Sequence, residues 1–178
     1  EEGKPAVPAS ARELFLSKCL EVGSACKSFQ DAVVVHHYDC DGIATGSIAG
    51  LALKSLGVAV DFLVAKRVDD SLVEKVSKMG KPAVFCDLGS GALLKIIQGF
   101  GEQKFAVIDH HELDVSVGEI ERQKVWEANP IAFGFNDPVG SSASSVAYLC
   151  FRDLVEGKTR ERIAQLGIVG AIGDMQDS

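Results

Sequence analysis

Four short segments carry acidic or histidine residues, and in the first three these residues follow an apolar run that suits a buried parallel strand. They read VVVHHYDCDG (33–42), AVFCDLGSG (83–91), FAVIDHHE (105–112) and GIVGAIGDMQD (167–177). Open parallel sheets bind ligands just beyond the carboxyl ends of their strands. We therefore expect these segments to gather carboxylates and imidazoles in one crevice, where divalent cations would offset the cost of unpaired buried carboxylates.

In the first segment, His37, Asp39 and Asp41 are spaced by two residues. Side chains with that spacing share one face of an extended chain, so His36 is expected to point away and to be structural. The alternative is a turn with aspartate caps, because Asp and Gly are common in turns. Gly42 permits a tight turn or a close approach of the following helix.

Single aspartates in the second and fourth segments are further candidates. Asp87 ends an apolar run and is either a ligand or the cap of the next helix. Asp174 follows a glycine-rich helix, which we expect to pack closely through its glycines. A carboxylate at a helix C-terminus is unfavourable unless a cation lies nearby. Asp177 is interpreted as a surface residue.

Asp109, His110 and His111 form the most specific motif of the chain. One imidazole can bind a metal ion through a ring nitrogen while its neighbour faces the substrate. The alternative is a pair of partly exposed histidines after a strand. The apolar run before the motif and the other acidic segments favour the functional interpretation.

Serines and a basic pair are candidates for substrate binding. Ser141 and Ser142, with two further serines, begin an expected helix whose free N–H groups either hold a backbone phosphate or are capped by the serines. Lys66 and Arg67 either contact a nucleic-acid backbone or are solvated loop charges.

Strand and helix patterns alternate along the chain and predict an α/β fold: a doubly wound, mainly parallel sheet of about five strands flanked by helices. Strands are expected at 31–37, 58–64, 82–87, 105–109 and 125–128, and helices at 11–29, 42–56, 69–79, 91–100, 141–154 and 159–172. Residues 112–123 are expected to form an acidic loop. We expect a lead-in and helix at 1–30 and one catalytic domain at 31–178.

Composition limits the class of protein. The 178 residues are 47% hydrophobic and carry a net charge of -7, which argues against a generic nucleic-acid-coating protein. Five scattered cysteines without a CxxC pair argue against a disulfide framework or structural zinc site. Cys40 and Cys86 are expected to be small core residues. No apolar stretch approaches about 20 residues, and no signal peptide is visible, so we expect a cytoplasmic protein.

The ordered motifs resemble the DHH phosphoesterase superfamily: HxDxDG at 37–42, the lone Asp87, DHH at 109–111 and the glycine-led Asp174. The segments ANPIAFGFND, GSSASSVAYL and GAIGDMQD are similar to those of archaeal RecJ-like nucleases. The resemblance implies a single-strand-specific exonuclease of DNA replication and repair that acts on single-stranded DNA or RNA. It implies two divalent ions, with Mn²⁺ preferred and Mg²⁺ as a substitute, and association with the replication machinery, including the GINS complex.

The resemblance also implies a role for each site residue. The ligands of one ion would be His37, Asp39 and Asp87. The ligands of the other would be Asp41, Asp87, His110 and Asp174. Asp87 would therefore bridge the ions, while His111 and Asp109 would be the catalytic residues, with His111 contacting the scissile phosphate.

Relatives in this superfamily carry a second, DHHA1-like domain after the catalytic one. It is absent from this sequence, so we expect a fragment with weak activity on long substrates. The same metal chemistry serves a phosphodiesterase or phosphatase for short or cyclic nucleotides or for pyrophosphate. A non-catalytic replisome scaffold on the same fold is a third interpretation, but such relatives are expected to have lost ligands that are intact here.

Overall fold

The computed structural model describes residues 9–116, 118, 120, 125–135 and 141–174. Its sheet has five strands, all parallel, in the order β2-β1-β3-β4-β5. The strands are β1 (Asp31–His37), β2 (Ala59–Ala65), β3 (Ala83–Cys86), β4 (Phe105–Ile108) and β5 (Trp126–Ala128). This sheet confirms the predicted fold class.

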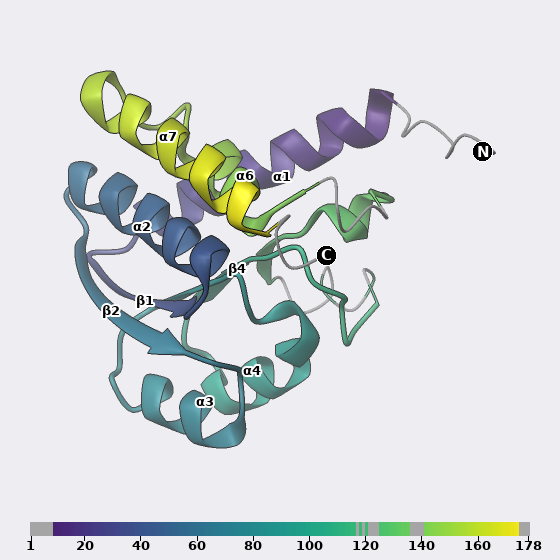
Figure 1. Ribbon diagram of the computed structural model, residues 1–178. Coiled ribbons are helices and arrows are strands. Elements are labelled where there is room, and N and C mark those ends of the chain that lie inside the picture. Colours follow the sequence, from purple (N-terminus) through teal and green to yellow (C-terminus); the bar gives the residue numbers. More distant parts are fainter. Residues whose placement is uncertain (1–8, 117, 119, 121–124, 136–140, 175–178) are drawn as a thin grey trace.

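Helices cover both faces of the sheet (Figure 1). One face carries α1 (Ala9–Lys27), α2 (Cys40–Ser55), α6 (Ala143–Phe151) and α7 (Gly157–Asp174). The other face carries α3 (Asp70–Ser77) and α4 (Leu93–Phe100). Two short 3₁₀ helices, η1 (Ser90–Ala92) and η2 (Pro130–Phe133), follow β3 and β5. The predicted helices are all present, with ends that differ by a few residues.

Alternation along the strands fills two separate cores. Val34 and Ala106 pack under the α1, α2, α6 and α7 layer, whereas Val33 and Val107 pack under α3 and α4. Each fully buried valine of this kind stabilises the fold by roughly 1.5–3 kcal/mol. His36 is also buried and lies against α2, where a Cβ at Gly46 would come 2.7 Å from the His36 Cβ. The prediction that His36 points away from the first motif is therefore confirmed.

The order in which strands are added to the sheet reverses between β1 and β3. These two strands are neighbours, although β2 lies between them in sequence. From β1 the chain crosses through α2 to one edge, while β4 and β5 extend the sheet toward the other edge. Loops that leave such a switch point diverge and open a crevice at the carboxyl ends of the strands. The first motif and Asp87 follow the two strands that flank this crevice.

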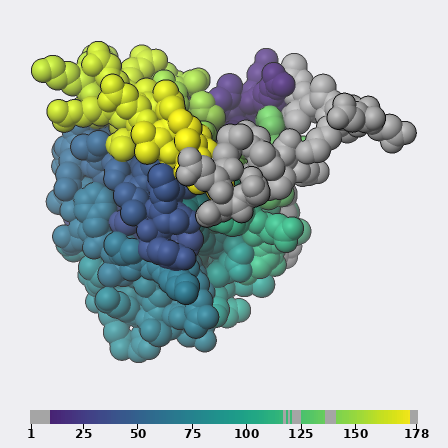
Figure 2. Space-filling view, viewed as in Figure 1, coloured from purple at the N-terminus to yellow at the C-terminus, as the bar shows by residue number. Residues whose placement is uncertain are grey.

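Glycines allow α7 to lie directly against α2 (Figure 2). A methyl group at Gly170 would overlap Ser144 Oγ and Asp41 Oδ1, and one at Gly173 would overlap the Cys40 side chain. The expected close packing of this glycine-rich helix is confirmed. It brings the end of α7 beside the first turn of α2.

The start of α2 corrects two predictions. Asp39 caps this helix by accepting a hydrogen bond from the Gly42 N–H at 2.9 Å, so the extended chain ends before Cys40. Asp41 therefore reaches the crevice from a helical turn. Cys40 is exposed, with its sulfur 3.8 Å from the Val169 carbonyl, and is not a core residue. Cys86 is buried, as predicted.

Some predictions fall partly or wholly on residues outside those described, among them the acidic loop at 112–123 and the surface position of Asp177. Among the helices that the structure describes, none combines the length and the apolar character needed to cross a bilayer.

Candidate metal centre

Seven side chains converge at the carboxyl ends of β1, β3 and β4 and at the end of α7. Their ligand atoms form three groups. In each group, all of the ligand atoms are at most 4.8 Å apart. The groups are His37 with Asp39 and Asp87, Asp41 with His110 and Asp174, and Asp87 with His110 and His111. The structure thus brings together all six residues predicted to bind metal, although binding itself stays a prediction.

Asp87 belongs to two of these groups, and His110 links the third group to them. Its φ of 60° is in the left-handed region, which is uncommon for a residue other than glycine and is often found at functional sites. The Asp87 N–H donates to the Ile108 carbonyl at 2.9 Å, which holds this strained position against β4. The side chain is only 2% exposed, and burial, reinforced by neighbouring carboxylates, raises its pKa to about 6.

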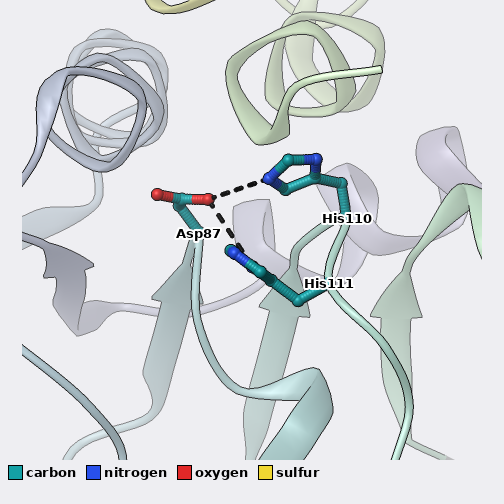
Figure 3. A group of neighbouring side chains, drawn as sticks. All are labelled: Asp87, His110 and His111. Carbon is teal, nitrogen blue, oxygen red and sulfur yellow. Dashed lines mark ion pairs between the residues drawn. The ribbon is translucent and has the colours of Figure 1, made fainter. Parts of the chain in front are cut away.

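The carboxylate of Asp87 faces the imidazole nitrogens of His110 and His111 (Figure 3). Its Oδ1 lies 3.5 Å from His110 Nε2 and 3.8 Å from His111 Nδ1, and it has no hydrogen-bond partner among the described residues. An unpaired buried oxygen of this kind is costly and marks a position for a cation.

His37 presents a second unpaired atom to the same place. Its Nδ1 lies 2.6 Å from Asp39 Oδ2 and 3.4 Å from Asp87 Oδ2, yet it makes no hydrogen bond within the described part of the chain. Two carboxylate oxygens and one imidazole nitrogen thus surround a single point. This is a suitable donor set for a divalent transition metal ion.

Asp41 is held by the start of α6. Its Oδ2 accepts a hydrogen bond from the Ala143 N–H at 2.7 Å, and its Oδ1 accepts one from the Ser144 N–H at 3.1 Å. The positive end of a helix dipole favours a carboxylate at this position. These contacts fix Asp41 from a segment about a hundred residues away.

His110 and Asp174 complete the second group. The His110 Nδ1–H donates to the Ser141 carbonyl at 2.6 Å, which leaves Nε2 free to act as a ligand. Burial alone would lower the pKa of His110, but the contact with Asp87 and the charges of nearby carboxylates raise it to about 9. Asp174 Oδ2 lies 3.9 Å from His110 Nδ1, and burial raises the pKa of Asp174.

Asp109 lies outside the three groups and holds the histidines in place. It is fully buried and accepts hydrogen bonds from the Ser90 N–H at 3.0 Å, the His110 N–H at 2.8 Å and the His111 Nδ1–H at 2.7 Å. Burial would raise its pKa, but these hydrogen bonds lower it. The same contact with Asp109 raises the pKa of His111. Asp109 therefore leaves the Nε2 of the half-exposed His111 available for a ligand.

The predicted basic pair lies beside the centre. Lys66 and Arg67 follow β2 and line a cavity of about 270 Å³ together with His37, Asp87 and His111. The Arg67 side chain is exposed, with its Nε 3.5 Å from Asp69 Oδ2. Both side chains therefore border the same cavity as His37 and His111.

The serines at 141 and 142 have structural contacts. Ser142 caps α6 by accepting a hydrogen bond from the Ser145 N–H at 3.2 Å. Asp41 accepts from the N–H groups of the two residues between them, Ala143 and Ser144. Of the two interpretations given above, these contacts favour a capped helix start, because Ser142 and the acidic side chain of Asp41 already accept from its first N–H groups. Substrate contact by the Ser141 or Ser142 side chains stays a prediction.

The sequence interpretation missed three buried polar residues next to the centre: Ser90, Glu127 and Asn129. They form hydrogen bonds with one another and with the histidine motif. A signal was present, because Glu127 interrupts an apolar strand and Asn129 directly precedes a proline. Their partners are far away in sequence, so this signal alone did not identify what they contact.

Comparison with known proteins gives one family and several structural neighbours. The model of the DHH family, N-terminal domain, matches residues 31–171. An uncharacterized protein of Methanocaldococcus jannaschii is 27% identical over 174 residues, which cover 91% of this chain. The chain spans only 39% of the length of that relative.

Three solved structures share the fold. Exonuclease RecJ bound to manganese gives a TM-score of 0.65 at 17% identity, over 92% of this chain and 45% of that one. RecJ from Thermus thermophilus in complex with Mn²⁺ gives 0.64 at 18% identity, over 97% and 26%. The DHH domain of a member of a ribosomal protein family gives 0.55 at 14% identity, over 94% and 51%.

Proposed function

The chain belongs to the DHH family, and we propose that it is a metal-dependent phosphoesterase that removes nucleotides from single-stranded nucleic acid. The observation that carries this proposal is the position of Asp87. One of its oxygens is buried without a hydrogen-bond partner in the described part of the chain, and its carboxylate lies between two sets of ligand atoms. A single bridging carboxylate with further acids and imidazoles on each side is the arrangement that two-metal phosphoesterases need.

The donor atoms fit divalent ions. One ion would be held by His37, Asp39 and Asp87. The other would be held by Asp41, Asp87, His110 and Asp174. Carboxylate oxygens with a few imidazole nitrogens suit Mn²⁺, and Mg²⁺ accepts the oxygen-rich part of the set. When bound, the ions would lower the pKa of an attacking water and offset the negative charge of the phosphodiester.

His111 would bind the scissile phosphate. Its Nδ1–H is held by Asp109, so its Nε2 can face the phosphate oxygens, and the raised pKa of this imidazole favours a protonated form that donates there. Asp109 is buried and would act through His111 without touching the substrate. This differs from the role that the family resemblance implied for Asp109, which was that of a second catalytic residue.

Lys66 and Arg67 would contact a phosphate next to the scissile one. They line the same cavity as His111 and carry positive charge in a chain with a net charge of -7. Such contacts position the backbone without reading bases, which suits a sequence-independent exonuclease. Exonuclease RecJ shares this fold, which supports an exonuclease activity. The single-stranded substrate and the association with GINS stay predictions.

Hydrolysis by the full chain with Mn²⁺ tests the proposal on three substrates: a labelled single strand, a dinucleotide and pyrophosphate. We expect mononucleotides to be released from the single strand, and no release by an Asp87→Asn variant. Faster hydrolysis of pyrophosphate or of the dinucleotide would contradict the single-strand assignment while keeping the metal chemistry. A protein that binds Mn²⁺ but hydrolyses none of the three would contradict the enzymatic function.

A further inference from the structure

Glu127, Ser90 and Asn129 form a buried polar cluster beside the histidine motif, here called the Glu127 cluster. Glu127 is 3% exposed, and Ser90 and Asn129 are fully buried. Burial raises the pKa of Glu127 to about 7, and its Oε2 has no hydrogen-bond partner within the described residues. Burying polar side chains in this way destabilises a fold unless their hydrogen bonds compensate. The cluster therefore lowers the stability of the fold unless its hydrogen bonds compensate, and the partners of these bonds indicate what the cluster does.

The hydrogen bonds of the cluster have a fixed direction. The Ser90 hydroxyl donates to Glu127 Oε1 at 2.6 Å, and Asn129 Nδ2 donates to Ser90 Oγ at 2.9 Å. A serine hydroxyl has one proton, so once Glu127 accepts it, only lone pairs are left to face Asn129. Glu127 thereby determines how both neighbours are oriented.

Two links lead from this cluster to His111. Asn129 Nδ2 also donates to the His111 carbonyl at 2.8 Å, which holds the main chain. The Ser90 N–H donates to Asp109 Oδ2 at 3.0 Å, and Asp109 Oδ1 accepts from the His111 Nδ1–H at 2.7 Å, which holds the imidazole. His111 is thus held at its backbone by Asn129 and at its ring by Asp109. Both of these residues contact Ser90, which donates to Glu127.

The imidazole of His110 depends on a different support. Its Nδ1–H donates to the Ser141 carbonyl at 2.6 Å, on the segment that leads into α6. Its side chain makes no hydrogen bond to the Glu127 cluster among the contacts that the structure describes. The two adjacent histidines can therefore be disturbed separately.

We propose that Glu127 is a positioning residue which, through Ser90 and Asn129, holds His111 with its Nε2 directed at the substrate. This rests on the proposed function, which gives His111 the task of binding the scissile phosphate. Glu127 has no contact with the predicted metal ligands among the interactions described, so its removal acts on the orientation of His111 and leaves metal binding in place.

The test compares Glu127→Leu, which removes the acceptor, with Glu127→Gln, which keeps a carbonyl oxygen for Ser90. The exposed Glu102→Leu is the control. Imidazole ¹⁵N spectra, recorded at a pH at which the ring is neutral and assigned with a His111→Ala sample, report the His111 tautomer independently of activity. We expect wild type and Glu127→Gln to show the Nδ1–H form and Glu127→Leu to show a shifted or mixed signal. In Mn²⁺-dependent hydrolysis, kcat should fall on the order of 10–100-fold in Glu127→Leu, with KM and Mn²⁺ affinity unchanged.

An unchanged His111 signal in folded Glu127→Leu would overturn the proposal, even if that variant unfolds at a lower temperature. If Glu127→Leu does not fold, Ser90→Ala removes the hydroxyl that joins Glu127 to Asn129, and Asn129→Ala removes the donor to the His111 carbonyl. Both variants keep the Ser90 backbone N–H that donates to Asp109, and both should still change the His111 signal. A normal His111 signal in both of those folded variants would equally contradict the positioning role. Absence of hydrolysis by wild type would refute the proposed function alone, because the tautomer is measured independently of turnover.

Discussion

The two sides of the metal centre hold their carboxylates in opposite ways. On the β1–α2 side, Asp39 and Asp41 accept hydrogen bonds from backbone N–H groups at the starts of α2 and α6. On the β3 side, Asp87 has an oxygen with no partner among the described residues and a backbone in the left-handed region. The protein thus supplies hydrogen bonds to the carboxylates on the first side, whereas the Asp87 carboxylate on the second side is left for a cation.

This difference indicates how the fold tolerates so much negative charge before a metal binds. Helix N-termini stabilise the acids of α2 by their dipoles and their free N–H groups. Asp87 lacks such support, and burial accordingly raises its pKa to about 6. We therefore expect substitutions on the two sides to have different consequences for metal binding and for stability.

The largest effect is expected for Asp87→Asn. Asparagine tolerates the left-handed backbone but removes the bridging charge, so both ions should be lost together and turnover should fall to background. Calorimetric titration with Mn²⁺ measures this, with the exposed Asp153→Asn as control. Two-site binding that is unchanged in Asp87→Asn would contradict the bridging role.

His111→Ala should be nearly as damaging to turnover, but without loss of metal. We expect kcat to fall by about 10²–10³-fold, the usual result of removing a group that stabilises transition-state charge. Mn²⁺ titration of the same variant should match wild type. Loss of metal in this variant would show that the two histidines exchange the roles assigned to them here.

The affinity for Mn²⁺ should rise with pH between about 6 and 9. Ligands must lose their protons to bind metal, and the pKa of Asp87 is raised to about 6 and that of His110 to about 9. Each competing proton changes the affinity by up to about tenfold per pH unit within that range. Titrations at pH 6, 7, 8 and 9 in a non-chelating buffer measure the slope, and a flat profile would disagree with this arrangement.

The two sides should also differ in stability without metal. At pH 8, Asp41→Asn should destabilise the protein by about 1–2 kcal/mol, because α6 loses the charge that caps it. Asp87→Asn should have the opposite sign. A carboxyl whose folded pKa is raised favours the folded state at low pH and loses that contribution as pH rises through about 6, so the ionised Asp87 opposes folding at pH 8.

Urea unfolding at pH 8 in chelator compares the two variants directly. The difference between them should shrink at pH 5, where Asp87 is largely protonated in the folded protein. Equal destabilisation by both substitutions at pH 8 would show that the two sides do not differ as described.

The sequence was informative wherever an apolar run stopped at an acid. β1 occupies Asp31–His37 as predicted, and the aspartates after β1, β3 and β4 meet because parallel strands end at one edge of the sheet. Strand alternation also predicted correctly that His36 points away from the first motif. These features depend on local patterns and on a general rule for parallel sheets.

Other features depend on contacts between distant segments and could not be predicted. Asp41 reaches the site from a helix because Asp39 ends the extended chain, and this also exposes Cys40. The hydrogen bond between Ser90 and Glu127 joins residues 37 positions apart, and that between Asp41 and Ala143 joins residues 102 positions apart. Neither partner carries a local signal that identifies the other.

Anomalous scattering from a crystal soaked in Mn²⁺ tests the central claim most directly, because it locates the ions without relying on activity. The arrangement around Asp87 predicts two peaks about 3.5–4 Å apart, one on each side of its carboxylate. A single peak away from Asp87, or no peak in the crevice, would contradict the account of a two-metal centre.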